Sequence, residues 1–240
     1  MPSNNIHINT RLLQAARDGE IETIQALIAE RTHLEPRDIN ESTPLYIAAG
    51  QGHLACVQAL IDAQANLNAR DLNGWTPLYI AAYNGHSTTV QILAAAGSNL
   101  EARNEDNWTP LHFAARYGHT STVQALYNAG AVLGATNNEG MKPIHLAAKY
   151  GYAETVQQLI QFGAEVNATN NQGMTPLHIA TENGHVHVIQ ALVNSGANLN
   201  AININGWTAL QLATFSNRTT IVQMLRNAGA TDPQQCCTIM

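Results

Sequence analysis

The chain has 240 residues and a formal net charge of −6, with 11 lysine and arginine residues against 17 aspartate and glutamate residues. Affinity for nucleic acid is built mainly from lysine and arginine, so this balance argues against a nucleic-acid partner. Three cysteines make no disulfide framework, and no apolar run reaches the 18 residues of a membrane span. Together with the lack of a signal-peptide pattern at the N-terminus, these features predict a cytoplasmic protein.

The first predicted unit covers residues 8–36, after an N-terminal tail of residues 1–7. It contains the apolar pairs Leu12-Leu13 and Ala15-Ala16, and Gly19 lies 33 residues before Gly52. The same helix is expected to turn polar residues to solvent, as the end of a stack requires: Arg11, Gln14, Arg17 and Asp18.

The following units repeat with a fixed spacing of 33 residues and no insertion. A Thr-Pro-Leu triplet or a close variant opens the first helix of each unit, at Thr43, Thr76, Thr109, Lys142, Thr175 and Thr208. The units are expected at 37–69, 70–102, 103–135, 136–168 and 169–201, with a C-terminal cap at 202–230. A flexible tail of residues 231–240 would follow.

Each unit is predicted to be a turn followed by two antiparallel helices. Threonine at the N-cap accepts a bond from a backbone amide, and the following proline has no amide to leave unpaired. Glycines such as Gly85 and Gly97 end the two helices. Asn-Gly pairs such as Asn73-Gly74 supply the turn between units. One unit cannot bury its own apolar face, so the copies must stack.

This pattern resembles the ankyrin repeat, whose length and Thr-Pro-Leu-His signature it matches over about residues 8–230. The resemblance implies an all-α solenoid of seven helix–turn–helix units with β-turn fingers. It also implies a monomer that binds proteins and has no catalytic activity.

Some units depart from the repeat. Lys142 removes one threonine N-cap, at a cost of about 1 kcal/mol. Asn107 replaces the turn glycine, and asparagine tolerates a positive φ. The last unit has Ala209 for proline, Gln211 for histidine, and Asn217-Arg218 for Gly-His, which is typical of a cap.

The ten histidines do not form a catalytic or metal-binding pattern. Seven of them occupy two repeat slots in which the family resemblance implies hydrogen bonds between neighbouring turns: His112, His145 and His178 in one, and His53, His86, His119 and His185 in the other. His185 and His187 are two residues apart on a helix and do not face each other. Cys56 occupies a slot of small packed residues. No phosphate loop, nucleophile elbow or zinc spacing is present. We therefore expect no enzyme, no cofactor and no metal.

The candidate binding residues are those at which the repeats differ. The resemblance to ankyrin arrays implies that the turn tips and the inner helices line a concave groove, and that this groove selects the partner. Tyrosine, tryptophan, arginine and methionine are enriched at binding hot spots. These types gather at Trp75, Tyr79, Tyr83, Trp108, Arg116, Tyr117, Met141, Lys149 and Tyr150. Arg116 and Lys149 favour a partner that is acidic or mixed in charge near these two residues.

The sequence ends in Cys237-Thr238-Ile239-Met240, which has the form of a C-a-a-X prenylation box. The expectation is farnesylation of Cys237 by a prenyltransferase. One lipid gives only marginal membrane binding, so S-acylation of Cys236 is the expected second anchor. Prenylation requires a eukaryotic enzyme. The lysine-poor, asparagine- and glutamine-rich composition resembles ankyrin effectors that some intracellular bacteria deliver to host cells.

The resulting hypothesis is a non-catalytic protein-binding adaptor on the cytosolic face of a membrane. A soluble cytosolic adaptor or inhibitor with an unmodified tail is the alternative. An enzyme that recruits substrate through the groove would need titratable residues gathered there. A purely structural role would bury the groove aromatics against each other.

Overall fold

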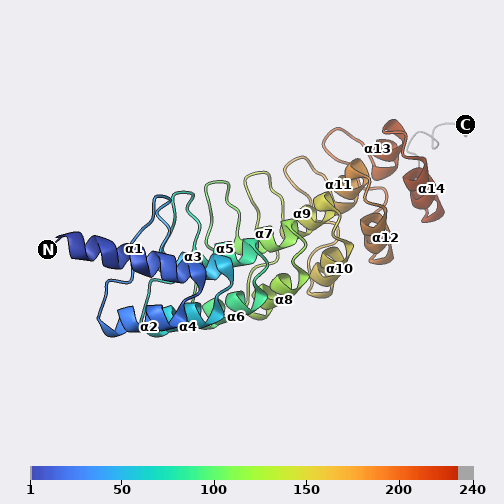
Figure 1. The fold of residues 1–240 in the computed structure, drawn as a ribbon. Helices are drawn as coiled ribbons and strands as arrows, with labels where there is room; N and C mark the ends of the chain where they lie inside the picture. Colours follow the sequence, from blue (N-terminus) through green and yellow to red (C-terminus); the bar gives the residue numbers. More distant parts are fainter. Residues whose placement is uncertain (1, 232–240) are drawn as a thin grey trace, which may run out of the picture. The chain divides into compact units, whose positions relative to one another are not determined.

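The computed structural model describes residues 2–231, which form fourteen helices and no strand (Figure 1). Seven pairs of helices were expected, and seven pairs are present. The helices are α1 (Pro2–Asp18), α2 (Ile21–Ala29), α3 (Pro44–Gln51), α4 (Leu54–Asp62), α5 (Pro77–Tyr83), α6 (Ser87–Ala95), α7 (Pro110–Arg116), α8 (Thr120–Asn128), α9 (Pro143–Tyr150), α10 (Ala153–Gln161), α11 (Pro176–Asn183), α12 (Val186–Asn194), α13 (Ala209–Phe215) and α14 (Thr219–Asn227).

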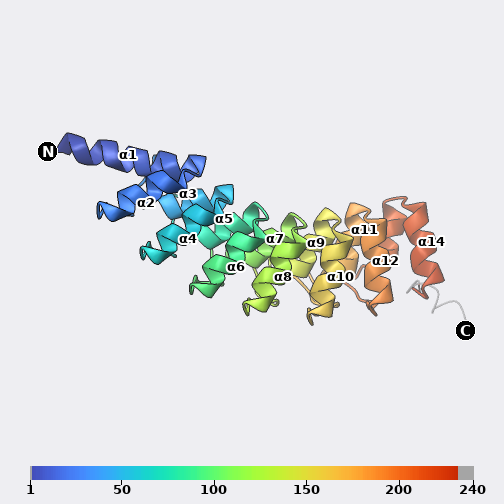
Figure 2. The ribbon, with the colours of Figure 1, turned by 60° about the horizontal axis from the view of Figure 1, so that its bottom comes forward.

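These helices belong to two compact units. One contains the chain up to Ala114 together with Ser121–Val132, and the other contains Ala115–Thr120 and the chain from Leu133 onward. In the first unit, α1, α3 and α5 pack in one row and α2, α4 and α6 in a second. In the second unit, α9, α11 and α13 form one row, and α10 packs on α12 (Figure 2).

The first helix of a repeat begins where the sequence predicts, because its N-cap is satisfied locally. Thr43 Oγ1 accepts a bond from the Tyr46 amide at 3.3 Å, with Pro44 in the first turn. Gly52 then ends α3 with a φ of 74°. Asn107 and Asn217 adopt the positive φ otherwise supplied by glycine, at 61° and 53°.

The core of each unit consists of leucines and small residues from facing helices. The alanine pairs, such as Ala48-Ala49 and Ala147-Ala148, are completely buried. A methyl side chain at these positions lets neighbouring helices approach closely. Leu45 and Leu78 fill the adjoining space and are at most 1% exposed.

Hydrogen bonds from the Gly-His slot tie successive repeats together. His53 Nε2 donates to the carbonyl of Arg17 at 3.0 Å, and His86 Nε2 donates to that of Gly50 at 3.0 Å. In the second unit, His185 Nε2 donates to the carbonyl of Lys149 at 2.9 Å. These three bonds confirm the predicted structural role of the slot. The Arg218 guanidinium replaces the histidine in the last repeat and donates to the carbonyl of Glu182 at 2.8 Å.

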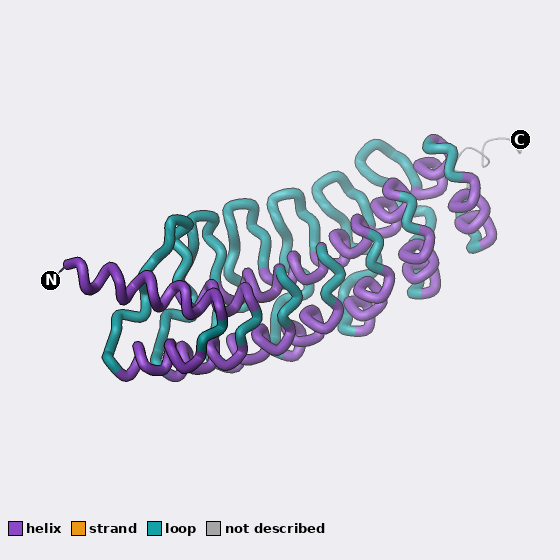
Figure 3. Tube along the Cα trace, viewed as in Figure 1, coloured by secondary structure: helices purple, strands orange, loops and turns teal. Residues whose placement is uncertain are grey.

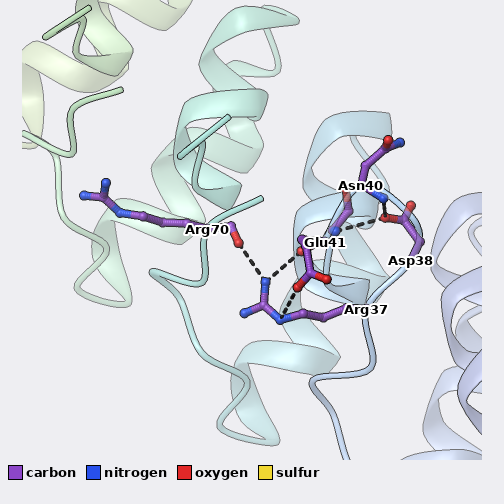
Figure 4. Close-up of polar contacts among 6 residues, drawn as sticks. Arg37, Asp38, Asn40, Glu41 and Arg70 are labelled. Carbon is purple, nitrogen blue, oxygen red and sulfur yellow. Dashed lines mark hydrogen bonds and ion pairs between the residues drawn. The ribbon is translucent and has the colours of Figure 1, made fainter. Parts of the chain in front are cut away.

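The loops between repeats project as fingers (Figure 3), and one aspartate or asparagine organises the tip of each. In the first finger, Asp38 Oδ1 accepts the amides of Asn40 and Ser42 at 2.9 and 3.0 Å (Figure 4). The same slot holds Asp71, Asn104, Asn137, Asn170 and Asn203. Each of these side chains fixes its turn as an Asx turn does.

Arginine also joins the fingers of the first unit. Arg37 Nη1 donates to the carbonyl of Glu41 at 2.8 Å and to that of Arg70 at 2.7 Å (Figure 4). Arg70 repeats this contact with the carbonyl of Arg103 at 3.3 Å. Arg37 and Arg70, which are 33 residues apart, therefore each support the backbone of the following finger.

Helix α1 is longer than expected. It begins at Pro2, so residues 2–7, predicted as a tail, are helical and continuous with the first repeat. The predicted polar face is present: Arg11, Gln14, Arg17 and Asp18 are exposed. Ile6, in the extension, is 67% exposed.

Candidate protein-binding surfaces

The nine predicted binding residues lie in both units. Trp75, Tyr79, Tyr83 and Trp108 belong to the first, and Arg116, Tyr117, Met141, Lys149 and Tyr150 to the second. They therefore form two surfaces, one in each unit.

The surface of the first unit is a set of packed aromatic rings, here named the aromatic cluster: Trp75, Tyr79, Tyr83, Trp108 and Phe113. The Trp75 ring lies 4.9 Å from Tyr79 and 5.2 Å from Tyr83, measured between centroids. In both pairs the rings are tilted against each other, a favourable arrangement for aromatic side chains. Trp75, Tyr83 and Trp108 are half-buried, so part of each residue remains at the surface. Tyr79 is completely buried and supports this surface from beneath.

Phe113 is the centre of the aromatic cluster and was not among the predicted residues. Its ring lies 4.8 Å from Tyr79, 4.8 Å from Trp108 and 5.4 Å from Trp75. Only 8% of Phe113 is exposed. A signal was present in the sequence, because this slot holds isoleucine or leucine in the other five motifs and phenylalanine only here.

The surface of the second unit is built around Arg116, and we name it the tyrosine–arginine stack: Arg116, Tyr117, Lys149 and Tyr150. The Arg116 guanidinium carbon lies 4.8 Å from the ring centroid of Tyr150 and 5.6 Å from that of Tyr117. Both distances fall within the range of cation–π attraction. Lys149 is half-buried, and Tyr150 is 38% exposed. The rings thus hold one guanidinium in place on a surface that also carries an ammonium group.

Met141 is part of the finger rather than of this surface. It is 3% exposed, and its amide donates to Asn137 Oδ1 at 2.9 Å. The amide group of Asn170 contacts its sulfur at 3.5 Å. A methionine in this environment orders two neighbouring fingers.

His145, His178 and Tyr46 have shifted pKa values and are hydrogen-bonded in structural roles. His145 Nδ1 accepts the Lys142 amide at 3.0 Å, and its Nε2 donates to the carbonyl of Ala168 at 2.9 Å. Burial lowers the pKa of His145 to about 4 and also lowers that of His178. Burial and the neighbouring Asp71 carboxylate raise the pKa of Tyr46, whose hydroxyl donates to Asp71 at 3.1 Å. Burial also raises the pKa of the Cys56 thiol.

At the start of α9, one of the two hydrogen bonds of the cap is kept, because the Lys142 amide still donates to His145 Nδ1. The ammonium of Lys142 cannot accept a bond, so the predicted loss of the threonine cap is confirmed.

No metal site or membrane span is found in the described chain. Among residues 2–231, no three His, Cys, Asp or Glu side chains gather so as to hold a metal ion. Within the same range, no helix has the length and apolar character that crossing a membrane requires. Cys236 and Cys237, the predicted lipidation residues, lie outside the described residues.

Comparisons with known proteins agree with this architecture. The family profile for ankyrin repeats (3 copies) matches residues 12–104, 94–170 and 145–235. The chain is similar to the crystal structure of the human ASB11 ankyrin repeat domain, with 29% sequence identity and a TM-score of 0.82. That match covers 92% of this chain and 98% of the other. Comparison with curated protein sequences gave no match.

Ankyrin repeats are generally non-catalytic protein–protein interaction modules. The stacked helix pairs, the Thr-Pro helix starts and the profile match lead to one conclusion: this chain belongs to the ankyrin repeat family.

Proposed function

We propose that the chain is a non-catalytic adaptor that binds a protein partner through the aromatic cluster and the tyrosine–arginine stack. This proposal rests on one observation: both surfaces carry partly exposed residues of the types that are enriched at binding hot spots, namely tryptophan, tyrosine and arginine. Trp75, Tyr83 and Trp108 are half-buried in the first unit, and Tyr150 is 38% exposed in the second. Rings held by their neighbours lose little conformational entropy when a partner covers them.

The two surfaces favour different parts of a partner. The aromatic cluster offers apolar ring faces without a charged member, so it suits apolar or aromatic side chains. The tyrosine–arginine stack offers a guanidinium and an ammonium, so it suits carboxylates. A partner that has both apolar and acidic residues would meet these demands.

Site-specific photo-crosslinking in cells tests the proposal. A photoreactive residue at position 150 should form a discrete adduct with a protein partner. The matched control is position 157 in α10, where Gln157 is exposed on the second helix of the same repeat. Adducts at 157 and none at 150 would contradict the proposed surface.

We further propose that a chain ending at Met240 is farnesylated on Cys237 and displayed on the cytosolic face of a membrane. The support is the sequence Cys237-Thr238-Ile239-Met240, together with Cys236 as a second acylation residue. Expression in a eukaryotic cell should give a farnesyl mass increment and recovery with membranes, both lost in Cys237→Ser. An unmodified mass and recovery in the soluble fraction for wild type would favour the soluble cytosolic adaptor instead.

A further inference from the structure

A ladder of hydrogen bonds links successive repeats near the end of each second helix. In every rung, a backbone amide donates to the side-chain oxygen of the residue 31 positions earlier, at 2.8–3.0 Å. The acceptors are carboxylates or amides: Glu35, Asn68, Glu101, Asn167 and Asn200. The donors are the amides of Asn66, Asn99, Val132, Asn198 and Thr231.

One rung of this ladder has no side chain to supply its acceptor. The 33-residue period places Gly134 in the acceptor slot and Glu165 in the donor slot. The φ angle of Gly134 is not in the left-handed region, so a residue other than glycine could adopt the same backbone conformation. A Cβ atom at Gly134 would meet no heavy atom within 4 Å. The slot that accepts the donor amide in the other rungs therefore offers no side-chain oxygen to the amide of Glu165.

Gly134 and Glu165 line a cavity of about 180 Å³ in the second unit, together with Leu133, Lys142, Ile144, Gly163 and Ala164. It adjoins a hollow of about 470 Å³, and Lys142 and Glu165 line both. Leu133 and Ile144 give the smaller cavity an apolar wall. Its volume is several times that of a water molecule.

A second departure from the repeat places a cation in the same cavity. Lys142 stands where the other five motifs have threonine. Its Nζ contacts Glu165 Oε2 at 2.5 Å, which leaves two further donors on the ammonium. The Lys142 side chain is 22% exposed, while that of Glu165 is 71% exposed. The Glu165 carboxylate can therefore move into water, while the ammonium stays at the cavity.

We propose that this cavity, the Gly134–Lys142 site, binds a carboxylate on a short aliphatic stem. One carboxylate oxygen would accept the Glu165 amide and replace the missing oxygen of the rung. The other would accept from the Lys142 ammonium in place of the Glu165 carboxylate, and the stem would contact Leu133 and Ile144. The proposal does not depend on the aromatic cluster or the tyrosine–arginine stack.

The same chemistry is available from a free aliphatic acid or from an acidic side chain of a bound protein. Sodium propionate is the probe for the first source. For the second, the probe is a terminally blocked Ala-Glu-Ala peptide, with Ala-Gln-Ala as its uncharged control. The readout is the NMR amide signal of Glu165 in the intact chain, with sodium chloride at matched ionic strength as the reference.

Two variants close the site without removing a core side chain. Gly134→Asn supplies the acceptor that Asn68, Asn167 and Asn200 provide in other rungs. Lys142→Thr removes the cation and restores the threonine of the repeat. Asn68→Gly is the matched control, because it empties a rung in the first unit where no lysine is present.

We expect propionate, the glutamate peptide or both to shift the Glu165 signal saturably in the wild-type chain. The affinity should fall at least tenfold in Gly134→Asn and in Lys142→Thr, and Asn68→Gly should create no response at Asn99. A response to the peptide alone would assign the site to an acidic side chain. The proposal is overturned if neither probe shifts Glu165, or if Gly134→Asn responds as wild type does.

Discussion

At the scale of single residues, His145 is held as a neutral ring between two backbone groups. Its side chain is completely buried, and protonation would convert the Nδ1 acceptor into a donor that faces the Lys142 amide. Burial therefore lowers its pKa from 6.5 to about 4. This position of the repeat therefore favours a side chain that accepts a hydrogen bond at one end and donates one at the other.

The lowered pKa of His145 predicts that stability depends on pH. The unfolded chain binds this proton more tightly, so the stabilisation is complete above about pH 6.5 and falls as the pH drops toward 4. The free energy of unfolding should fall by at most about 1.4 kcal/mol for each pH unit between pH 6.5 and pH 4. His145→Gln should reduce the slope, because Gln211 fills the same slot and accepts the Thr208 amide at 2.9 Å. Urea unfolding at pH 7 and pH 5 checks this, and an unchanged slope in the variant would contradict it.

The glycines that end helices are not equivalent. Gly118 has a φ of 69°, and a Cβ atom there would lie 2.3 Å from Cδ1 of Tyr152. Gly130 has a φ of 96°, and a Cβ atom there would meet nothing within 4 Å. Gly130→Ala should therefore cost only the left-handed backbone strain, about 1 kcal/mol. Gly118→Ala must also displace the Tyr152 ring and should cost about 2–3 kcal/mol. Equal losses of unfolding free energy would show that the ring moves freely.

At the scale of elements, the ladder of side-chain acceptors joins the end of one repeat to the next. Glu35, Asn68 and Glu101 serve the first unit, and Asn167 and Asn200 serve the second. In this series, Gly134 has no side-chain oxygen that could accept a hydrogen bond. The ladder therefore predicts where the array can be stabilised.

Gly134→Asn should raise the free energy of unfolding by about 1–2 kcal/mol. Part of the gain comes from the smaller entropy of the unfolded chain, about 0.4–1 kcal/mol, and part from the new bond to the Glu165 amide. Gly134→Ala separates the two, since it gives the first contribution without the second. Chemical denaturation of both variants measures the difference. An asparagine variant no more stable than the alanine variant would mean that the rung does not form.

The helix starts were predictable because their causes are local. Threonine, proline and leucine at fixed spacing determine the N-cap, the first turn and the first core contact within four residues. The contacts between repeats were harder to predict because they depend on side-chain reach over 23–36 residues. Arg218 in place of histidine is one example, since its guanidinium reaches the same carbonyl slot by a different route.

The candidate surfaces were predicted in part. The sequence slots placed Trp75, Trp108, Arg116 and Tyr150 among the candidate residues, but they did not show how deep each side chain lies. Tyr79 is buried because Trp75 and Phe113 pack on its ring, a consequence of having aromatics in adjacent repeats. Pattern reasoning counts such residues as exposed because it treats each repeat separately.

At the scale of the whole molecule, each repeat contacts mainly its neighbours, so a substitution on one surface has local effects. This property suits a binding protein, because recognition residues can vary while the caps and the ladder maintain the stack. A net charge of −6 with only two lysines also makes Arg116 and Lys149 distinctive cations on an acidic chain. Both lie in the tyrosine–arginine stack, for which the proposed function expects acidic groups on the partner.

The most direct test of the account is the affinity of the chain for its purified partner, once crosslinking at position 150 has identified it. Isothermal titration should show that Trp108→Ala and Tyr150→Ala each weaken binding at least tenfold, a loss of about 1.4 kcal/mol or more. Gln157→Ala, on the second helix of the Tyr150 repeat, should bind as wild type does. Thermal unfolding of each variant confirms that the fold is intact. Full affinity in both aromatic variants, or a loss confined to Gln157→Ala, would contradict recognition through these surfaces.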